Sequence, residues 1–301
     1  MKNRLHRTNR PSFNFIGKIL SIIVVSMIFF SCEEDDKRIE NQVDDEPPLT
    51  GGWQRVFNDE FDDYLSFNNW ELTNRFDYNS VYGKYVSAVP YVDLIHGKSV
   101  LVLTATPSGE VYETGHVKSK FDFKPARNEE FHVSASIRLL AMKEADTMAF
   151  ADTYGAWPAF WTVQESDWPV SGEIDIMEGY SYAGQTRFAS NIFYGTTVGK
   201  NLLGTTAERE YHLDEGWHTY DMHWENSNGV ITITTKVDGE IRATYTNETN
   251  ANLDLSKFGP HNIILNLNVG DNYGIFDNSQ INLFTKTMMW VDYVTVNKRT
   301  I

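Results

Sequence analysis

The chain has 301 residues, of which 14% are aromatic, and it carries a net charge of −15 at pH 7. A surface this acidic repels nucleic acid, because phosphate binding needs a basic patch, so the sequence argues against a nucleic-acid partner. Since Cys32 is the only cysteine, no internal disulfide can form and the folded part must be stabilised by its core.

The N-terminal residues have the composition of an export signal. Residues 1–18 are basic and polar, and Ile19 to Phe30 is a twelve-residue apolar run. A membrane-spanning helix needs about 20 apolar residues, so this shorter run predicts the apolar region of a signal peptide. It leads into Phe30-Ser31-Cys32, which resembles the lipobox of bacterial lipoproteins, in which the cysteine is lipidated and acyl chains anchor the protein. We expect residues 1–31 to be a lipoprotein signal peptide and Cys32 the lipidation site; the alternative is an ordinary signal peptide.

Residues 32–50 have the composition of a tether. Between residues 33 and 50 there are eight acidic and two basic side chains and few apolar ones, too few to bury a core. We expect a disordered, solvated segment. An acidic run after the lipidated cysteine also resembles the export signal of some Gram-negative surface lipoproteins. The expected location is therefore the bacterial outer membrane, at the cell surface or otherwise on the periplasmic face.

From Gly51 onward, short β-rich runs separated by turn residues predict an all-β sandwich or barrel. Residues 230–237 alternate with period two, Asp238-Gly239 supplies a tight turn, and residues 240–246 return as the second strand of a hairpin. Similar strands are expected at 100–105, 263–269 and 288–296. Because no linker or internal repeat interrupts this pattern, residues 51–301 are predicted to form a single domain.

The acidic segment from Gly172 to Tyr180 is the most informative part of the sequence. In a strand, residues two apart share a face, so Glu173 and Asp175 project together while Ile174 packs into the core. Regular alternation would turn Glu178 to the other face. One extra residue at positions 176–177, a β-bulge, would restore the parity and bring all three acids into one cleft.

Three carboxylates on one face suit the hydrolysis of a glycosidic bond. Retaining glycosidases need two carboxyl groups about 5–5.5 Å apart, one as nucleophile and one as general acid/base. Neighbouring acids also resist simultaneous ionisation, so at least one pKa should rise toward the value that a proton donor requires. The alternative is a solvated strand whose carboxylates face water, but adjacent like charges on one face destabilise a sheet.

The run Gly172-Glu-Ile-Asp-Ile-Met-Glu178, preceded by Trp157-Pro-Ala-Phe-Trp161 and Trp168-Pro169, resembles glycoside hydrolase family 16. This family includes laminarinases, lichenases, agarases and carrageenases, and the spacing of the acids resembles its bulged-strand branch. The resemblance extends over about residues 52–298. It implies a concanavalin A-like jelly-roll β-sandwich with a substrate cleft on its concave sheet, retention of anomeric configuration, and no cofactor for the chemistry.

Carried over residue by residue, the resemblance implies roles for the three acids. Glu173 takes the nucleophile role, Asp175 the assisting role and Glu178 the acid/base role. Rings expected to stack on sugar or to form the cleft wall are Trp157, Trp161 and Trp168; among them we favour Trp157 and Trp168, because Trp161 could equally belong to the core.

Further substrate contacts are expected at Asn191, Tyr194 and Asn266. Many laminarinases place a histidine on the strand after the catalytic one, whereas residues 188–195 here offer Asn191, Phe193 or Tyr194 instead. This departure leaves the identity of the polysaccharide open. Some relatives also bind a structural calcium ion, and Asp292 together with backbone carbonyls near Glu60 is the expected site, with a plain strand aspartate as the alternative.

The function expected from these observations is endo-acting, retaining hydrolysis of a neutral β-linked polysaccharide by a monomeric, membrane-anchored enzyme. A β-1,3-glucan or a mixed-linkage β-1,3/1,4-glucan is the expected substrate, and an agar-type β-galactan is the alternative. A third hypothesis is a non-catalytic surface lipoprotein that binds glycans. It would need the aromatic side chains but not the three carboxylates.

Overall fold

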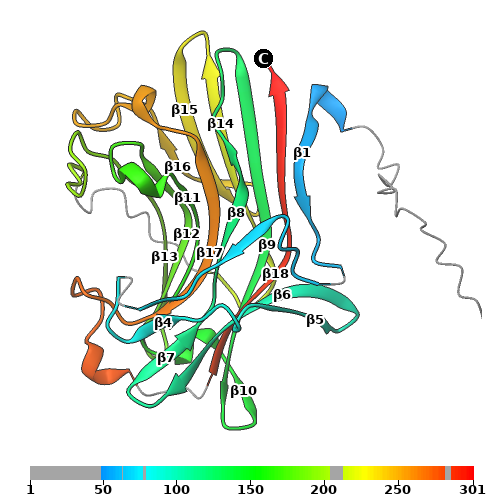
Figure 1. Ribbon diagram of the computed structural model, residues 1–301, viewed down its shortest axis with the longest axis vertical. Helices are drawn as coiled ribbons and strands as arrows, with labels where there is room; N and C mark the ends of the chain where they lie inside the picture. Colours follow the sequence, from blue (N-terminus) through cyan, green and yellow to red (C-terminus); the bar gives the residue numbers. More distant parts are fainter. Residues whose placement is uncertain (1–48, 63, 77–78, 204–212, 282–285) are drawn as a thin grey trace, which may run out of the picture. The chain divides into compact units, whose positions relative to one another are not determined.

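Two β-sheets lie face to face in the computed structural model, which describes residues 49–301 except 63, 77–78, 204–212 and 282–285 (Figure 1). The predicted signal peptide (1–31), the expected lipidation site Cys32 and the predicted tether to residue 48 lie outside the described residues. Those that are described belong to one compact unit, Pro47–Ile301. None of its described helices has the length and apolar character needed to cross a membrane.

The larger sheet has twelve strands. They are β1 (Gln54–Asp59), β3 (Arg75–Phe76), β4 (Gly83–Tyr85), β5 (Tyr91–Ile95), β6 (Lys98–Ser108), β7 (Val111–Thr114), β9 (Glu129–Lys143), β10 (Asp146–Met148), β14 (His218–Ser227), β15 (Val230–Val237), β16 (Glu240–Tyr245) and β18 (Lys286–Thr300). Their order is β16-β15-β14-β9-β18-β6-β7-β4-β3, with β1 beside β18, β10 beside β9 and β5 beside β6.

The smaller sheet has six strands in the order β13-β12-β11-β17-β8-β2. Their bounds are β2 (Trp70–Leu72), β8 (His116–Phe123), β11 (Ala156–Val163), β12 (Glu173–Ser181), β13 (Thr186–Phe193) and β17 (His261–Val269). The described helices are single 3₁₀ turns, η1 (Thr50–Gly52), η2 (Phe150–Asp152), η3 (Glu165–Asp167), η4 (Leu255–Lys257) and η5 (Asn278–Gln280). The smaller sheet curves so that its outer side is concave, toward the left in Figure 1.

The inner faces of both sheets form one hydrophobic core. Its largest fully buried side chains include Trp70, Trp224, Tyr220 and Phe160. The Trp70 indole Nε1 donates a hydrogen bond to the Asp59 carboxylate at 2.7 Å, so the polar end of this buried ring is satisfied.

The predicted strand pattern is confirmed. Along β15 the side chains of Ile231, Ile233 and Val237 are buried and alternate with more exposed ones, as a half-buried strand requires. The turn that follows has positive φ at both Asp238 (51°) and Gly239 (79°), the backbone needed for a tight hairpin. The all-β sandwich expected from the sequence is therefore the observed fold.

Candidate active site

The register of β12 contains the predicted bulge. Trp161 on β11 lies opposite Asp175, whereas its neighbour Phe160 lies opposite Met177, so Ile176 has no partner on that side. The pairing of β12 with β13 shifts at the same place. The bulge inferred from the spacing of the acids is therefore confirmed.

The bulge turns Glu173, Asp175 and Glu178 to one side of the sheet. Their partners across β11 are, in the same order, Val163, Trp161 and Ala159. These three partners form a small cluster of their own, separate from the inter-sheet core, and directly paired residues of neighbouring strands share a face. All three carboxylates therefore belong to the outer, concave face.

Gly172 sets the backbone direction just before the first acid. It has φ = +81°, a region that side-chain-bearing residues rarely adopt. A Cβ at this position would also lie 2.4 Å from the ring of Phe258. Glycine is therefore required both by the local turn and by the close approach of the core ring beneath it.

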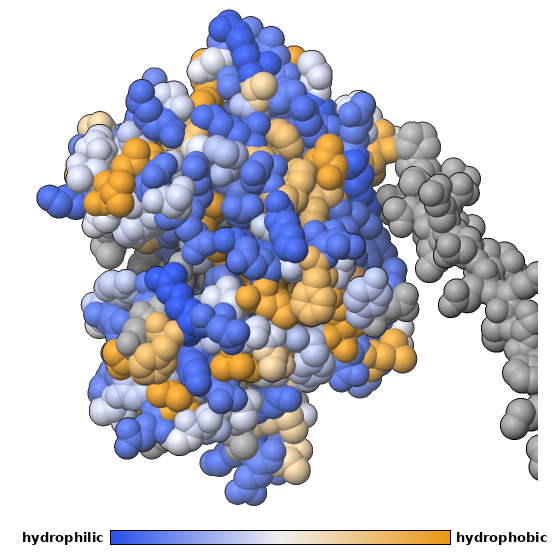
Figure 2. Space-filling model, in the orientation of Figure 1, coloured by the Kyte–Doolittle hydropathy of each residue, from blue (hydrophilic) through white to orange (hydrophobic). Residues whose placement is uncertain are grey.

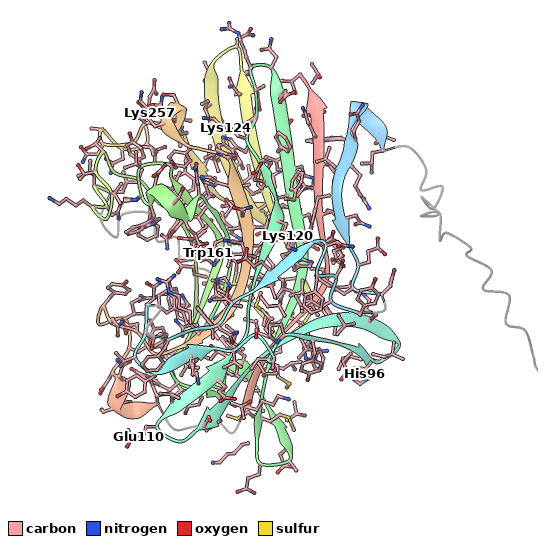
Figure 3. All side chains as sticks on the ribbon, in the orientation of Figure 1. His96, Glu110, Lys120, Lys124, Trp161 and Lys257 are labelled. Atoms are coloured by element: carbon pink, nitrogen blue, oxygen red, sulfur yellow. The ribbon has the colours of Figure 1, made fainter. Side chains whose placement is uncertain are left out.

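The acids lie in a hollow of the surface. Figure 2 shows the molecule hollowed at the left between an upper and a lower block of side chains. Trp161 lies at this hollow in Figure 3, and β12 with its acids is the neighbouring strand. Asp175 is 3% and Glu178 is 7% exposed, while Glu173 is half-buried. The carboxylates therefore lie deep in a groove rather than on an open sheet surface.

Both oxygens of the Glu178 carboxylate accept hydrogen bonds from neighbouring side chains. The Trp157 indole Nε1 donates to Oε1 at 3.0 Å, and the Asn191 amide Nδ2 donates to Oε2 at 2.7 Å. Tyr180 and Asp175 also hydrogen-bond this carboxyl group. Asn191, expected to contact substrate, therefore touches the expected acid/base itself.

Trp157 is held by packing as well as by this hydrogen bond. Its ring stacks on Tyr180 with centroids 5.9 Å apart, and both rings belong to an aromatic cluster that includes Tyr154 and Phe276. Only 9% of Trp157 is exposed. The geometry thus gives Trp157 a part in orienting Glu178, in addition to any contact with sugar expected from the sequence.

Burial dominates the electrostatics of the three acids. It raises the pKa of Glu173 to about 8, with a further contribution from the charge of Glu178 and an opposing one from the Trp168 indole N–H. Burial also raises the pKa of Asp175 well above its usual value, and the charges of Glu178 and Glu173 add to this. The pKa of Glu178 is raised by burial too, but its hydrogen bonds, of which the one from Asn191 is largest, oppose the rise.

A stability measurement can test this electrostatic environment. The unfolded pKa of Glu173 is near 4.5 and the folded pKa is near 8, so the folded state binds more protons between these values. The stability that this group contributes is fully present below about pH 4.5 and is lost as the pH rises through about 8. We expect Glu173→Gln to raise Tm at pH 8 by on the order of 5 °C, the shift that roughly 2 kcal/mol causes in a domain of this size.

The same Glu173→Gln variant should unfold at nearly the wild-type temperature at pH 4, because both side chains are then neutral. Scanning calorimetry at both pH values checks this, and Glu240→Gln on the exposed edge strand β16 is the matched control. An equal change in Tm at pH 4 and pH 8 would contradict the expected burial of charge at Glu173.

Trp161 and Trp168 form the apolar floor of the groove. The Trp161 indole Nε1 donates to Asn266 Oδ1 at 2.7 Å, which fixes the ring on the outer face of β11. Trp168, half-buried, packs against the same small cluster. Trp161, whose place the sequence left open between core and cleft, thus lies on the cleft side, and Asn266 lies beside it.

One expected substrate contact is corrected. Tyr194 is only 4% exposed and belongs to the main inter-sheet core, where its ring stacks on Phe258 with centroids 5.9 Å apart. The reason is strand parity, because Phe193 pairs with Glu173 and the next side chain turns to the opposite face. Tyr194 therefore does not contact a ligand in the groove.

Tyr273 was not predicted from the sequence. It is 68% exposed, and its hydroxyl donates to Asn79 Oδ1 at 2.9 Å. The Asp271 carboxylate accepts hydrogen bonds from the backbone N–H groups of Tyr273, Ile275 and Phe276, which fixes this turn. Burial first, and then the charge of Glu173, raise the pKa of Tyr273, so its hydroxyl lies within electrostatic range of the groove acids.

The calcium ion expected at Asp292 and the backbone near Glu60 stays a prediction. Asp292 forms an ion pair with the Lys98 ammonium, which already neutralises its charge. Both line a cavity of about 340 Å³ together with Glu60 and Asp62. In the part of the chain that the structure describes, no group of three or more His, Cys, Asp or Glu side chains is arranged to hold a metal ion.

Comparison with known proteins shows which domains and structures the chain is similar to. Residues 136–252, less than half of the chain, match the family model described as the XgeA-like, catalytic GH16 domain, in agreement with the resemblance found in the sequence. Two relatives are 30% identical to the chain. Glucan endo-1,3-beta-glucosidase A1 of Niallia circulans aligns over 162 residues, which are 48% of this chain and 22% of that protein. Glucan endo-1,3-beta-glucosidase of Cryptopygus antarcticus aligns over 159 residues, which are 46% of this chain and 55% of that protein.

The alignments thus span about half or less of the length of these relatives. Solved structures match more completely. The Bacteroides ovatus mixed linkage glucan PUL GH16, in complex with a product, has a TM-score of 0.62 and 25% identity, covering 80% of this chain and 99% of that chain. Endo-1,3-beta-glucanase from Streptomyces sioyaensis has a TM-score of 0.66 and 22% identity, covering 85% and 100%. These likenesses confirm the jelly-roll sandwich.

Proposed function

We propose that this chain, whose residues 136–252 match a GH16 catalytic domain, is a retaining endo-hydrolase of a β-1,3-glucan or a mixed-linkage β-1,3/1,4-glucan. The bulge in β12 is the observation that carries the proposal, because it puts Glu173, Asp175 and Glu178 on one face of the groove. The two relatives, both named as glucan endo-1,3-beta-glucosidases, support the choice of substrate. The chemistry needs no cofactor.

The reaction that fits this arrangement is a double displacement. In the first step Glu173 attacks the anomeric carbon while Glu178 gives its proton to the departing glycosidic oxygen, which forms a glycosyl-enzyme. In the second step Glu178 takes a proton from a water molecule, whose oxygen attacks the same carbon and releases Glu173. Two inversions at one carbon give net retention.

The hydrogen bonds and the burial of the acids bear on where the proton resides. The donors from Trp157 and Asn191 favour a charged Glu178, whereas burial favours a neutral Glu173. The reaction needs the opposite arrangement. Positive charge that develops at the anomeric carbon stabilises an ionised Glu173 in the transition state. The attraction between this charge and the Glu173 carboxylate grows as the glycosidic bond breaks. Asp175, hydrogen-bonded to Glu178, can pass the proton within the group.

Removal of the Asn191 amide should shift the pH profile. This donor lowers the pKa of Glu178, and a hydrogen bond to a charged group is worth roughly 1.5–3 kcal/mol, or about one pH unit or more. Because Glu178 acts as an acid, activity is lost as the pH rises through the pKa of the group. In Asn191→Ala we therefore expect the alkaline limb of the pH profile of kcat/KM to shift to higher pH by about one pH unit. An unchanged alkaline limb would contradict the assigned role.

Binding of a neutral polymer agrees with the lining of the groove. Trp161 and Trp168 offer apolar ring surface that suits a pyranose face, and Asn266 offers an amide. Three buried acids disfavour sulfated or uronic sugars near the cleaved bond, because like charges repel in a poorly solvated site.

The location of the enzyme is a separate part of the proposal. The basic and apolar residues 1–30, followed by Cys32 and an acidic segment, support a lipid-anchored enzyme of the bacterial outer membrane that works as a monomer. Cys32→Ala should release the protein from the membrane fraction. Unchanged membrane association of this variant would exclude lipid anchoring through Cys32.

The proposed activity can be tested with a panel of purified polysaccharides. We expect release of oligosaccharides from β-1,3-glucan or mixed-linkage glucan, with a rapid fall in polymer size that marks internal cleavage. Proton NMR of fresh products should show the β-anomer first. Release from agar-type galactan alone would overturn the substrate assignment, and binding without any product would identify a non-catalytic glycan-binding protein.

A further inference from the structure

A lysine and two glutamates meet on the groove side of the smaller sheet, away from the three acids. The ammonium Nζ of Lys118 on β8 lies 3.0 Å from Glu165 Oε2 on η3 and 3.7 Å from Glu71 Oε2 on β2. The side chain of Lys118 is 26% exposed, that of Glu165 is 33% exposed and that of Glu71 is 60% exposed, so a ligand can reach all three. Burial alone would lower the pKa of Lys118. The hydrogen bond and the charge of Glu165, together with the charge of Glu71, outweigh burial and raise this pKa, so the ammonium stays protonated.

This Lys118–Glu165–Glu71 cluster lies on the same row of the sheet as the central acid. Directly paired positions run from Asp175 to Trp161, from Trp161 to Ile264, from Ile264 to Lys118 and from Lys118 to Glu71. Directly paired residues share a face, and strands lie about 4.8 Å apart, so Lys118 is three strand spacings, or roughly 14 Å, from Asp175. The charge of Glu165 also raises the pKa of Glu173, so the cluster is electrostatically connected with the acids.

A polysaccharide that crosses the strands over Trp161 would extend toward this cluster. The distance exceeds one pyranose ring, so a residue bound there belongs to a subsite remote from the cleaved bond. Glu165 and Glu71 come from two different chain segments, so two carboxylate acceptors lie beside one ammonium donor.

The chemistry of the cluster suits a neutral sugar. An ammonium carries three N–H donors, and Glu165 takes one of them, whereas 3.7 Å to Glu71 is too long for a hydrogen bond. Free N–H donors and carboxylate lone pairs can therefore meet the hydroxyls of one sugar, which both donate and accept. Two carboxylates against one ammonium leave a net negative charge, which repels sulfate and uronate groups.

We propose that Lys118, with Glu165 and Glu71, forms a distal subsite that binds a neutral hexopyranose residue of the polymer several positions from the cleaved bond. This inference rests on the proposed function, because it names a further binding position of the same groove. Lys118 determines how strongly longer substrates bind and takes no part in bond cleavage.

The test compares neutral β-1,3-glucan oligosaccharides of increasing length with wild-type enzyme and Lys118→Met. Methionine keeps most of the length of the side chain but lacks the charge and the donors. We expect kcat/KM for the shortest cleaved substrates to stay unchanged, and kcat/KM for longer ones to fall about tenfold, the value of one hydrogen bond to a charged group. KM should account for most of this loss, and Lys118→Arg should restore part of it.

Lys120→Met is the matched control, because Lys120 lies on the same strand but donates to the backbone carbonyl of Phe67. Its profile should follow the wild type at every length. A loss of equal size for short and long substrates, or no loss at any length, would overturn the distal subsite while leaving the proposed function intact. Absence of product from every oligosaccharide with wild-type enzyme would instead refute the proposed function.

Discussion

Replacement of Glu173 by alanine is expected to lower kcat/KM by at least about 10⁴-fold on every polysaccharide that the wild type cleaves, because the covalent route loses its nucleophile. The effect should appear in kcat rather than in KM, since in the proposed double displacement Glu173 contributes most in the transition state. Reducing-sugar release with purified protein measures it, and Glu240→Ala, an exposed carboxylate on β16, is the control that should keep full activity.

A small anion should restore part of the activity of Glu173→Ala on a substrate with an activated leaving group. Azide can occupy the space left by the missing carboxylate and attack the anomeric carbon on the side opposite the leaving group. The product is then the α-glycosyl azide, with inverted configuration. Activity of the variant within tenfold of the wild type, or a β-configured azide product, would contradict the nucleophile role of Glu173.

Replacement of Glu178 by alanine should have a different signature. General acid and base catalysis contributes about 10²–10⁴-fold, so hydrolysis of polysaccharides, whose leaving groups need a proton, should fall by that factor. Aryl glycosides with acidic phenols leave without protonation, so their first step should be much less affected. The glycosyl-enzyme then accumulates, because no base activates water for the second step, and a rapid burst of phenol should precede slow turnover.

Azide again distinguishes the roles. In Glu178→Ala it enters the side from which water normally attacks the glycosyl-enzyme, so the product should be the β-glycosyl azide, with retained configuration. An equal loss for aryl glycosides and polysaccharides, without a burst, would show that Glu178 does not act as the acid/base. The two variants together therefore assign the roles through opposite azide stereochemistry.

The strand that carries the acids could be predicted because the relevant information is local. Glu173 and Glu178 are five positions apart, and only an inserted residue can give them one face, so the spacing itself implied the bulge found at Ile176. The β15–β16 hairpin was predictable for the same reason, since period-two alternation and Asp238-Gly239 specify it within a short segment.

Contacts around the acids could not be predicted, because they depend on register between distant strands. Nothing near Glu178 in the sequence indicates that Trp157 and Asn191 donate to its two oxygens. The misassignment of Tyr194 arose similarly, since one residue of strand parity separates the groove from the core. Tyr180 was detectable, because it lies two positions from Glu178 and so shares its face.

Residues contributed by loops were the hardest to identify. Tyr273 approaches the groove through a turn fixed by Asp271 and a hydrogen bond to Asn79, nearly two hundred positions away in the chain. Lys118 and Glu165 meet for the same kind of reason, because β8 and η3 are brought together only by the folded sheet. No local pattern signals such pairs, so their roles emerge only from the three-dimensional arrangement.

Glu173 is expected to form a covalent bond to the sugar, and trapping of that intermediate tests this role most directly. A 2-deoxy-2-fluoro glucan oligosaccharide with an activated leaving group slows the second step, because fluorine destabilises the positively charged transition state, so the glycosyl-enzyme should persist. Peptide mass spectrometry of the labelled protein should then place the sugar on Glu173. A sugar on Glu178 or Asp175, or an unlabelled enzyme that releases product with inverted configuration, would contradict the nucleophile role of Glu173.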